Sequence, residues 1–305
     1  MAVVRLAVVC GPTAAGKSSL ALALAESCGL GIVSADSRQV YRGFDIGTAK
    51  PNAAERARIP HAGIDVADPT ERYSAARWMQ EFETWREGIE GTGRAALVVG
   101  GTGLYLRTLT EPLFEEPPLD DEARRALDDE LQLLALEELR ARCQSLDPAR
   151  AHLGRTQLLR AIEVATLTGR PISAWHRERA RDARYDARYL LVDPGVPALH
   201  ARIVQRVDAM LDDGWVDEVR RLMPQVPADA PAWNATGYDA IRQVVDGTLS
   251  LGMARDRVIV ATRQYAKRQR TWFRHQLPAA HVVRLDPSDP AAKERALAWY
   301  RDATR

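Results

Sequence analysis

The chain has 305 residues, and 42 lysine and arginine side chains nearly balance 41 aspartates and glutamates, leaving a formal net charge of +1. A polyanionic partner would therefore have to meet local basic patches and not a uniformly basic surface. The sequence has no apolar run of about eighteen residues, and the first apolar run begins near Met1, so we expect neither a membrane span nor a signal peptide. Three scattered cysteines without a Cys-x-x-Cys pair are typical of reduced thiols in a cytoplasmic protein and indicate no zinc site.

A glycine-rich loop lies between an apolar run, residues 3–9, and a helix-like run, residues 18–25. Strand, loop and helix in this order are the context in which the pattern G-x-x-x-x-G-K-[ST] binds phosphate. The glycines let backbone N–H groups face a phosphate, Lys17 adds a full positive charge, and the Ser18 hydroxyl is a ligand for Mg²⁺. The predicted phosphate-binding residues are Gly11, Pro12, Thr13, Ala14, Ala15, Gly16, Lys17 and Ser18.

Two more apolar runs, residues 31–35 and 95–99, predict parallel strands beside the first, and a shorter strand is predicted at 64–66. Ligands gather at the carboxyl ends of parallel strands, where Asp36 follows one of these runs. Asp36 is therefore either a functional carboxylate or a helix cap or turn residue. Gly100-Gly101-Thr102 follows the other run, and it either lets another molecule approach the Thr102 hydroxyl or forms a simple turn.

From Glu115 the alternation of strands and helices gives way to a mostly helical block. Helices are predicted after Asp120 or Asp121 and over residues 156–168. A strand over residues 189–193 then returns the chain to the sheet, and 281–285 is a further edge strand. We expect an α/β fold with a parallel, phosphate-loop NTPase-like sheet core, residues 1–114 and 189–305, and an inserted helical domain, residues 115–188.

Two later helices carry rows of basic side chains. Arg202 and Arg206 are one turn apart on a predicted helix, so they either close over a phosphate group or are solvated surface charges. Residues 255–274 predict a helix with an apolar seam and a basic stripe, which indicates a phosphate backbone as partner or a solvated basic face. The stripe consists of Arg263, Lys267, Arg270 and Arg274.

These stretches together resemble one family closely, the tRNA dimethylallyltransferases, also called tRNA isopentenyltransferases. The resemblance covers nearly the whole chain. It is carried by residues 11–18, 34–41, 45–51, 100–105, 261–269 and 271–272. Many kinases share the phosphate loop, whereas Ile-Gly-Thr-Ala-Lys-Pro at 46–51 and Arg-Gln-x-x-Lys-Arg-Gln at 263–269 are far more specific.

The resemblance implies transfer of a dimethylallyl group from dimethylallyl diphosphate to the exocyclic amine of the adenosine 3′-adjacent to the tRNA anticodon. It implies that Asp36 takes up the amine proton, Thr102 holds the acceptor, and Mg²⁺ binds at Ser18 beside the diphosphate. The helical insertion would grip the anticodon stem-loop, for which a monomer suffices. The implied tRNA contacts are Asp36, Ser37, Arg38, Gln39, Thr102, Arg124, Gln157, Arg160, Arg263, Lys267 and Arg270. Gln157 replaces an arginine usual in the family, and Arg155 is the candidate substitute.

Three other functions stay open at this point. An adenylate isopentenyltransferase of the same fold would prenylate a free nucleotide and would need no helical insertion. A small-molecule kinase would hold ATP in the loop, but it needs a magnesium-binding acid and an acceptor site that the sequence does not specify. A non-enzymatic RNA-binding protein would leave the phosphate loop and Asp36 without a role.

Overall fold

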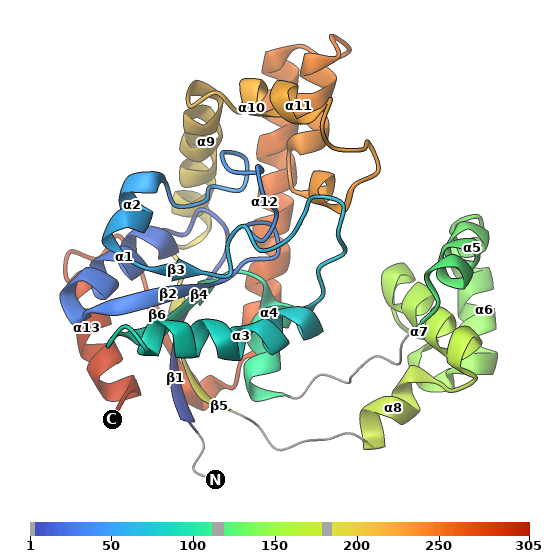
Figure 1. Ribbon diagram of the computed structural model, residues 1–305, viewed down its shortest axis with the longest axis horizontal. Helices are drawn as coiled ribbons and strands as arrows, with labels where there is room; N and C mark the ends of the chain where they lie inside the picture. Colours follow the sequence, from blue (N-terminus) through green and yellow to red (C-terminus); the bar gives the residue numbers. More distant parts are fainter. Residues whose placement is uncertain (1–3, 112–118, 179–184) are drawn as a thin grey trace. The chain divides into compact units, whose positions relative to one another are not determined.

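The computed structural model describes residues 4–111, 119–178 and 185–305, and it divides into two compact units (Figure 1). One unit consists of Met1–Thr110 and Arg184–Arg305 and contains the sheet, whereas Glu111–Ala183 forms the other. None of the helices in the described residues is both long and apolar enough to cross a membrane.

Six parallel strands form the sheet in the described part of the chain, in the order β3-β2-β4-β1-β5-β6. They are β1 (Val4–Cys10), β2 (Leu30–Ala35), β3 (His61–Ala62), β4 (Ala95–Gly100), β5 (Tyr185–Val192) and β6 (Val282–Leu285). The central strands are buried on both faces, which explains their nearly continuous apolar sequences. The predicted parallel α/β core is confirmed.

Two predicted strands differ from those observed. Residues 64 and 65 lie in a bend and residue 66 belongs to no strand, because Asp65 has φ +59° and its carboxylate binds Lys50 and Arg56. The strand predicted at 189–193 begins at Tyr185, so its first residues belong to the sheet and not to the insertion. The charged residues at the start of this strand do not fit the apolar pattern of a buried strand. Asp186 forms ion pairs with Arg5 of β1 and Arg188 of β5, so the strand pairing continues through these residues.

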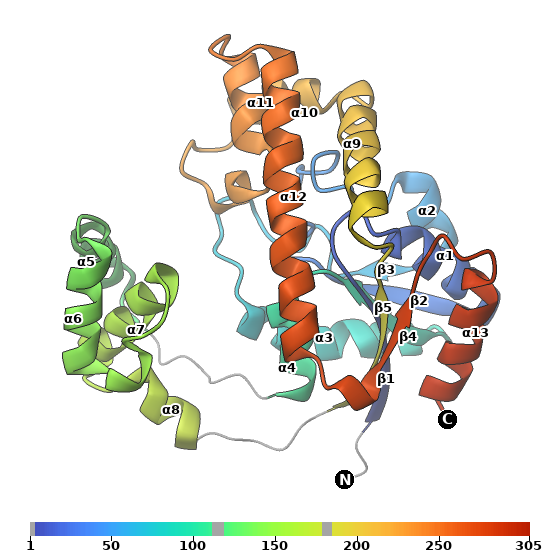
Figure 2. The same ribbon diagram turned by 180° about the vertical axis from the view of Figure 1, so that it is seen from behind.

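The helices of the sheet-containing unit either pack against the sheet or extend away from it. They are α1 (Lys17–Cys28), α2 (Ala53–Arg58), α3 (Ala75–Glu90), α4 (Gly103–Thr110), α9 (Val196–Asp212), α10 (Trp215–Leu222), α11 (Tyr238–Val245), α12 (Leu251–Gln276) and α13 (Ala292–Ala303). Helix α1 packs on α13, and α3 packs on α4. Ala7 and Val9 of β1 belong to the apolar core that includes α1 and α13, and Val8 points to the opposite face. The long helix α12 runs from the sheet past α9 to α11 (Figure 2).

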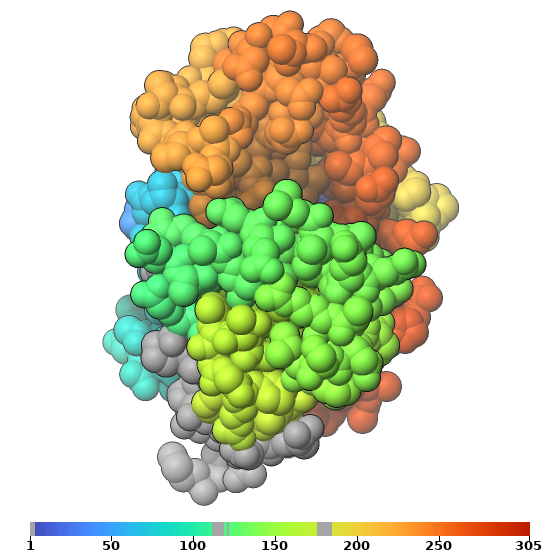
Figure 3. Space-filling view, turned by 90° about the vertical axis from the view of Figure 1, so that its right-hand side faces the viewer, coloured from blue at the N-terminus to red at the C-terminus, as the bar shows by residue number. Residues whose placement is uncertain are grey.

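The helical unit has its own apolar core. It contains α5 (Asp121–Gln132), α6 (Leu136–Leu146), α7 (Arg155–Thr168) and α8 (Ile172–Glu178), and Figure 3 shows its surface in green to yellow-green. Leu131, Leu139 and Ile162 are among the buried side chains that join these helices. The Asp120 carboxylate accepts from the N–H of Ala123 at 2.8 Å and caps α5, as predicted.

The close approach of β2 and β4 predicts a stability difference between two glycine substitutions. A Cβ on Gly100 would lie 2.1 Å from the Ala35 carbonyl oxygen, whereas a Cβ on Gly88, within α3, would meet nothing within 4 Å. Gly100→Ala should lower the free energy of unfolding by at least about 2 kcal/mol because the backbones must separate. Gly88→Ala should raise it by about 1 kcal/mol through helix propensity.

Urea unfolding of both variants, followed by far-UV circular dichroism, measures this difference. An unfolding midpoint for Gly100→Ala at or above that of the unsubstituted protein would show that β2 and β4 are not packed this closely.

Candidate active site

The phosphate loop joins the end of β1 to the first turn of α1 through strained backbone positions. Gly11 has φ +150° and Gly16 φ +95°, and Ala14 between them is also left-handed at +60°. A Cβ on Gly11 would lie 2.3 Å from the Val192 carbonyl oxygen, so this position has no room for a side chain. No side chain caps α1 among the described residues. The first N–H groups of α1 are therefore open to an anionic ligand.

Two cationic side chains, those of Lys17 and Arg206, line the cavity beside this loop. The Lys17 ammonium donates to the Pro12 carbonyl at 2.7 Å, and burial together with the nearby Arg206 charge lowers its pKa to about 8. Burial also lowers the pKa of Arg206, which forms no ion pair with any described residue. Arg202, one turn away, donates to the Ala15 carbonyl at 3.3 Å and supports the loop itself. Two unneutralised cations beside open N–H groups form a site suited to a diphosphate.

The ends of β2 and β4 carry Asp36 and Thr102. Asp36 Oδ1 accepts from the N–H of Arg38 at 2.9 Å, so the carboxylate does act as a turn residue. Its Oδ2 has no hydrogen-bond partner among the described residues, and the side chain lines the same cavity as Lys17 and Ser18. The Thr102 hydroxyl oxygen accepts a hydrogen bond from the N–H of Ser37 at 2.9 Å. Thr102 thus positions the segment that carries Asp36.

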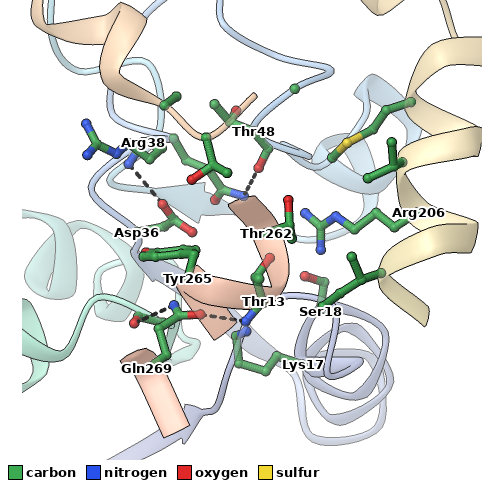
Figure 4. Close-up of a pocket in the computed structure, with 18 of the residues that line it drawn as sticks. Thr13, Lys17, Ser18, Asp36, Arg38, Thr48, Arg206, Thr262, Tyr265 and Gln269 are labelled. Carbon is green, nitrogen blue, oxygen red and sulfur yellow. Dashed lines mark hydrogen bonds between the residues drawn. The ribbon is translucent and has the colours of Figure 1, made fainter. Parts of the chain in front are cut away.

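One cavity brings together predicted residues from the phosphate loop, from the segment after β2 and from α9 (Figure 4). Arg206 from α9 and Ser18 from α1 point into it, and Asp36 lies on the opposite side beside Arg38. The predicted residues that line it are Thr13, Lys17, Ser18, Asp36, Arg38, Gln39 and Arg206. The structure adds residues that the sequence prediction missed, namely Thr48, Trp215, Thr262, Tyr265 and Gln269. Burial and the Asp36 charge raise the pKa of Tyr265 to about 12, so it stays a neutral hydroxyl in the cavity wall.

Gln269 of α12 connects the phosphate loop to the turn after β4. Its Oε1 accepts from the N–H of Thr13 at 2.8 Å, and its Nε2 donates to the Gly101 carbonyl at 2.8 Å. The side chain is 8% exposed, so both bonds form out of contact with bulk water. One carboxamide therefore fixes the spacing between the phosphate loop and the turn after β4.

Gln39 has a structural role at the cavity wall. Its Nε2 donates to the carbonyls of Thr48 and Ala49 at 3.2 and 3.1 Å, and its Oε1 accepts from the Ser34 hydroxyl at 3.0 Å. This carboxamide holds the loop over residues 45–51 against β2. The predicted contact of Gln39 with RNA would have to form beside these bonds.

The basic stripe of α12 is less uniform than its sequence indicates. Arg270 forms an ion pair with Asp193 at 3.0 Å, whereas Lys267 is exposed. Arg263 is partly buried, and its Nε has no hydrogen-bond partner among the described residues. Arg274 is exposed like Lys267, so Arg263, Lys267 and Arg274 are the members of the stripe that can meet an anionic partner.

In the helical unit, one glutamate organises the predicted arginines. Glu163 binds Arg124 through Oε1 and Arg160 through Oε2. The Arg155 guanidinium instead donates to backbone carbonyls at the end of α5, including that of Leu134 at 2.7 Å. Arg155 is therefore a helix-joining residue, and nothing in its contacts supports the predicted substitution for Gln157, which itself sits at the first turn of α7.

The donor set of the cavity fits Mg²⁺. The Ser18 hydroxyl and the Asp36 carboxylate both line it, and the described residues contain no group of three or more His, Cys, Asp or Glu side chains arranged for a metal. Mg²⁺ usually keeps several waters and takes one or two protein ligands together with phosphate oxygens. This oxygen set is therefore suited to a magnesium ion that arrives with a diphosphate.

The fold and the site define a phosphate-loop protein of the α/β class in which a carboxylate faces the phosphate site. The family model for IPP transferase matches residues 39–276, and that for isopentenyl transferase matches residues 4–60. The chain belongs to the IPP transferase family.

Named relatives agree with this assignment. A tRNA dimethylallyltransferase of Geobacter metallireducens is 45% identical over 276 residues, which cover 88% of this chain and 89% of the relative. A tRNA isopentenylpyrophosphate transferase structure from Bacillus halodurans superposes with a TM-score of 0.69 at 30% identity, covering 98% and 96% of the two chains. A eukaryotic dimethylallyltransferase acting on tRNA gives a TM-score of 0.82 at 27% identity, covering 98% of this chain and 79% of that one.

The lowered pKa of Lys17 predicts pH-dependent binding of the donor. An anionic ligand favours the charged ammonium, so the Kd for dimethylallyl diphosphate should rise as pH increases through about 8, by up to about tenfold per unit. The terminal phosphate is already ionised in this range, so it adds no trend of its own. Calorimetric titration from pH 7.5 to 9.5 measures the change. Lys17→Met should bind weakly at every pH without this trend, and a flat wild-type profile would contradict the role of Lys17.

The bonds of Gln269 predict a loss of activity on its removal. Gln269→Ala leaves the Thr13 N–H and the Gly101 carbonyl unpaired, at about 1–3 kcal/mol each, and lets the two loops separate. The kcat/KM for prenyl transfer should fall by about tenfold to a hundredfold. Gln264→Ala, an exposed position on the same helix, should change little. Equal effects of the two substitutions would exclude this role of Gln269.

Proposed function

We propose that this IPP transferase transfers a dimethylallyl group from dimethylallyl diphosphate to the exocyclic amine of the adenosine 3′-adjacent to the anticodon of tRNA, releasing diphosphate. The observation that carries the proposal is the single cavity in which Asp36 faces the cations Lys17 and Arg206. The names of the relatives support the same donor and acceptor.

The phosphate side of the cavity favours departure of diphosphate. As the allylic carbon–oxygen bond breaks, negative charge grows on the bridging oxygen. Lys17 and Arg206 already line the cavity, and no side chain caps the N–H groups at the start of α1 in the described residues, so these groups can stabilise that charge with little reorganisation. A magnesium ion held by the Ser18 hydroxyl would add further charge neutralisation for the leaving group when bound.

The carboxylate side serves the acceptor. The adenine amine is a weak nucleophile because its lone pair is delocalised into the ring. Asp36 can accept a proton from this amine as the new carbon–nitrogen bond forms, since Oδ1 is held by the Arg38 N–H and Oδ2 is available. Thr102 keeps the segment that carries Asp36 in place through Ser37.

The RNA contacts belong to this proposal as well. The target adenosine must leave its stack, which costs a few kcal/mol and is easier in a loop than in a duplex. Arg124 and Arg160 in the helical unit and Lys267 on α12 are the basic side chains that we assign to the phosphate backbone of the anticodon stem-loop. One copy of the chain supplies both groups, so a monomer can act.

A transfer assay with Asp36→Asn tests the proposal. Asparagine keeps an oxygen for the Arg38 N–H but cannot take a proton, so kcat should fall by about a hundredfold to ten-thousandfold while RNA still binds. The RNA mass is followed after mixing with Mg²⁺, dimethylallyl diphosphate and an anticodon stem-loop. Asp68→Asn is the matched control, because Asp68 accepts from a turn N–H in the same way but lies outside the cavity.

The acceptor is checked in the same assay with free AMP in place of RNA. Prenylated AMP with no modified RNA would assign the protein to nucleotide modification. Full activity of Asp36→Asn on RNA would exclude Asp36 as the base.

A further inference from the structure

The cavity has an apolar part that the phosphate and acceptor chemistry leaves unexplained. Ile203, Val207 and Met210 line it from one face of α9, the helix that also carries Arg206. In Figure 4 this helix stands on the side of the cavity away from Asp36. Trp215 of α10 and Val258 of α12 line the cavity as well. With the diphosphate at the loop, this apolar part is where a prenyl tail can be buried.

Trp215 is the largest of these apolar residues, and its ring is tightly enclosed. A Cβ on Gly47 would lie 2.3 Å from the indole nitrogen, and a Cβ on Gly237 would lie 2.4 Å from the far edge of the ring. The Tyr238 ring meets the indole edge-on, with 5.3 Å between centroids. The side chain is only 1% exposed. The indole therefore has no alternative position to which it could swing when a longer ligand arrives.

The buried carboxylate of Glu218, one turn after Trp215 on α10, stabilises this arrangement. Glu218 Oε2 accepts from the N–H groups of Asp45 and Ile46 at 2.9 and 2.7 Å, and Oε1 accepts from the Tyr238 hydroxyl at 2.6 Å. Glu218 is 1% exposed, so moving the loop away would leave a buried charge without its donors. These hydrogen bonds therefore join three segments: the loop that carries Gly47, helix α10 with Trp215, and the start of α11.

We propose that Trp215, held in place by Glu218, is the specificity-determining residue that restricts the donor to a five-carbon prenyl group. This inference rests on the proposed function. The physical argument is steric. If the cavity were open at this wall, the added methylene groups of a ten-carbon chain would be buried, and each would strengthen binding. Against a fixed wall, the same groups must force packed side chains apart, so binding weakens.

Binding and transfer of two donors test this inference. Dimethylallyl and geranyl diphosphate are titrated by calorimetry into the wild-type protein, Trp215→Leu and Trp233→Leu. Trp233 is the matched control, because it is a buried tryptophan of the same aromatic cluster that does not line the cavity. Transfer of both groups to the anticodon stem-loop is measured in parallel, and circular dichroism establishes that each variant is folded.

Wild-type protein should bind geranyl diphosphate at least about tenfold more weakly than dimethylallyl diphosphate, the scale of about 1.4 kcal/mol of steric cost. Trp215→Leu should reduce that ratio about tenfold or reverse it, and it should transfer geranyl groups, whereas Trp233→Leu should keep the wild-type ratio. If Trp215→Leu does not fold, Trp215→Phe replaces it, with a smaller shift expected in the same direction.

Three results would overturn the inference: equal binding of the two donors by wild type, an unchanged ratio in a folded Trp215 variant, or an equal shift in Trp233→Leu. The binding ratios are independent of transfer. If they follow the expected pattern but no group reaches RNA, the proposed function fails while the role of Trp215 stands.

Discussion

The two hydrogen bonds of the Gln269 carboxamide set the geometry on which the rest of the site depends. They join α12 to the phosphate loop at Thr13 and to the turn after β4 at Gly101. Because α12 is a continuous helix, fixing it at this point also fixes Tyr265 and Thr262, which lie one and two turns earlier on the cavity wall. The sheet sets the separation of the strand ends, and this single side chain connects the loops that follow them.

A second constraint is electrostatic. Lys17 and Arg206 each disfavour the charge of the other, and the lowered pKa of Lys17 reports that cost together with its burial. The Asp36 charge opposes the shift without forming an ion pair with either cation in the described residues. The free site is thus strained by unneutralised positive charge, which a bound diphosphate relieves. Strain of this kind is expected where a protein is arranged for a ligand and not for its own stability.

Sequence reasoning succeeded for structure where the signal is local. The main strands depend on short patterns, and so do the positions of the phosphate loop and Asp36 at strand ends. Gln269 and Glu218 act on segments 168 and 172 residues away, and no local pattern identifies such partners. The false strand at 64–66 has a local cause, because the ion pairs of Asp65 override the strand preference of its apolar neighbours. The sequence places Arg270 in a basic stripe, but it does not show that the fold brings Asp193 close enough to form an ion pair with Arg270.

The arginines of the helical unit follow the same logic as Gln269. Pairing with Glu163 removes part of their charge, which weakens long-range attraction to a polyanion. In exchange, one carboxylate holds two guanidinium groups at a fixed separation before any ligand arrives. Preorganised guanidinium groups lose less side-chain entropy on binding phosphate than free ones. The glutamate therefore weakens attraction at long range and fixes the geometry of the two guanidinium groups at contact.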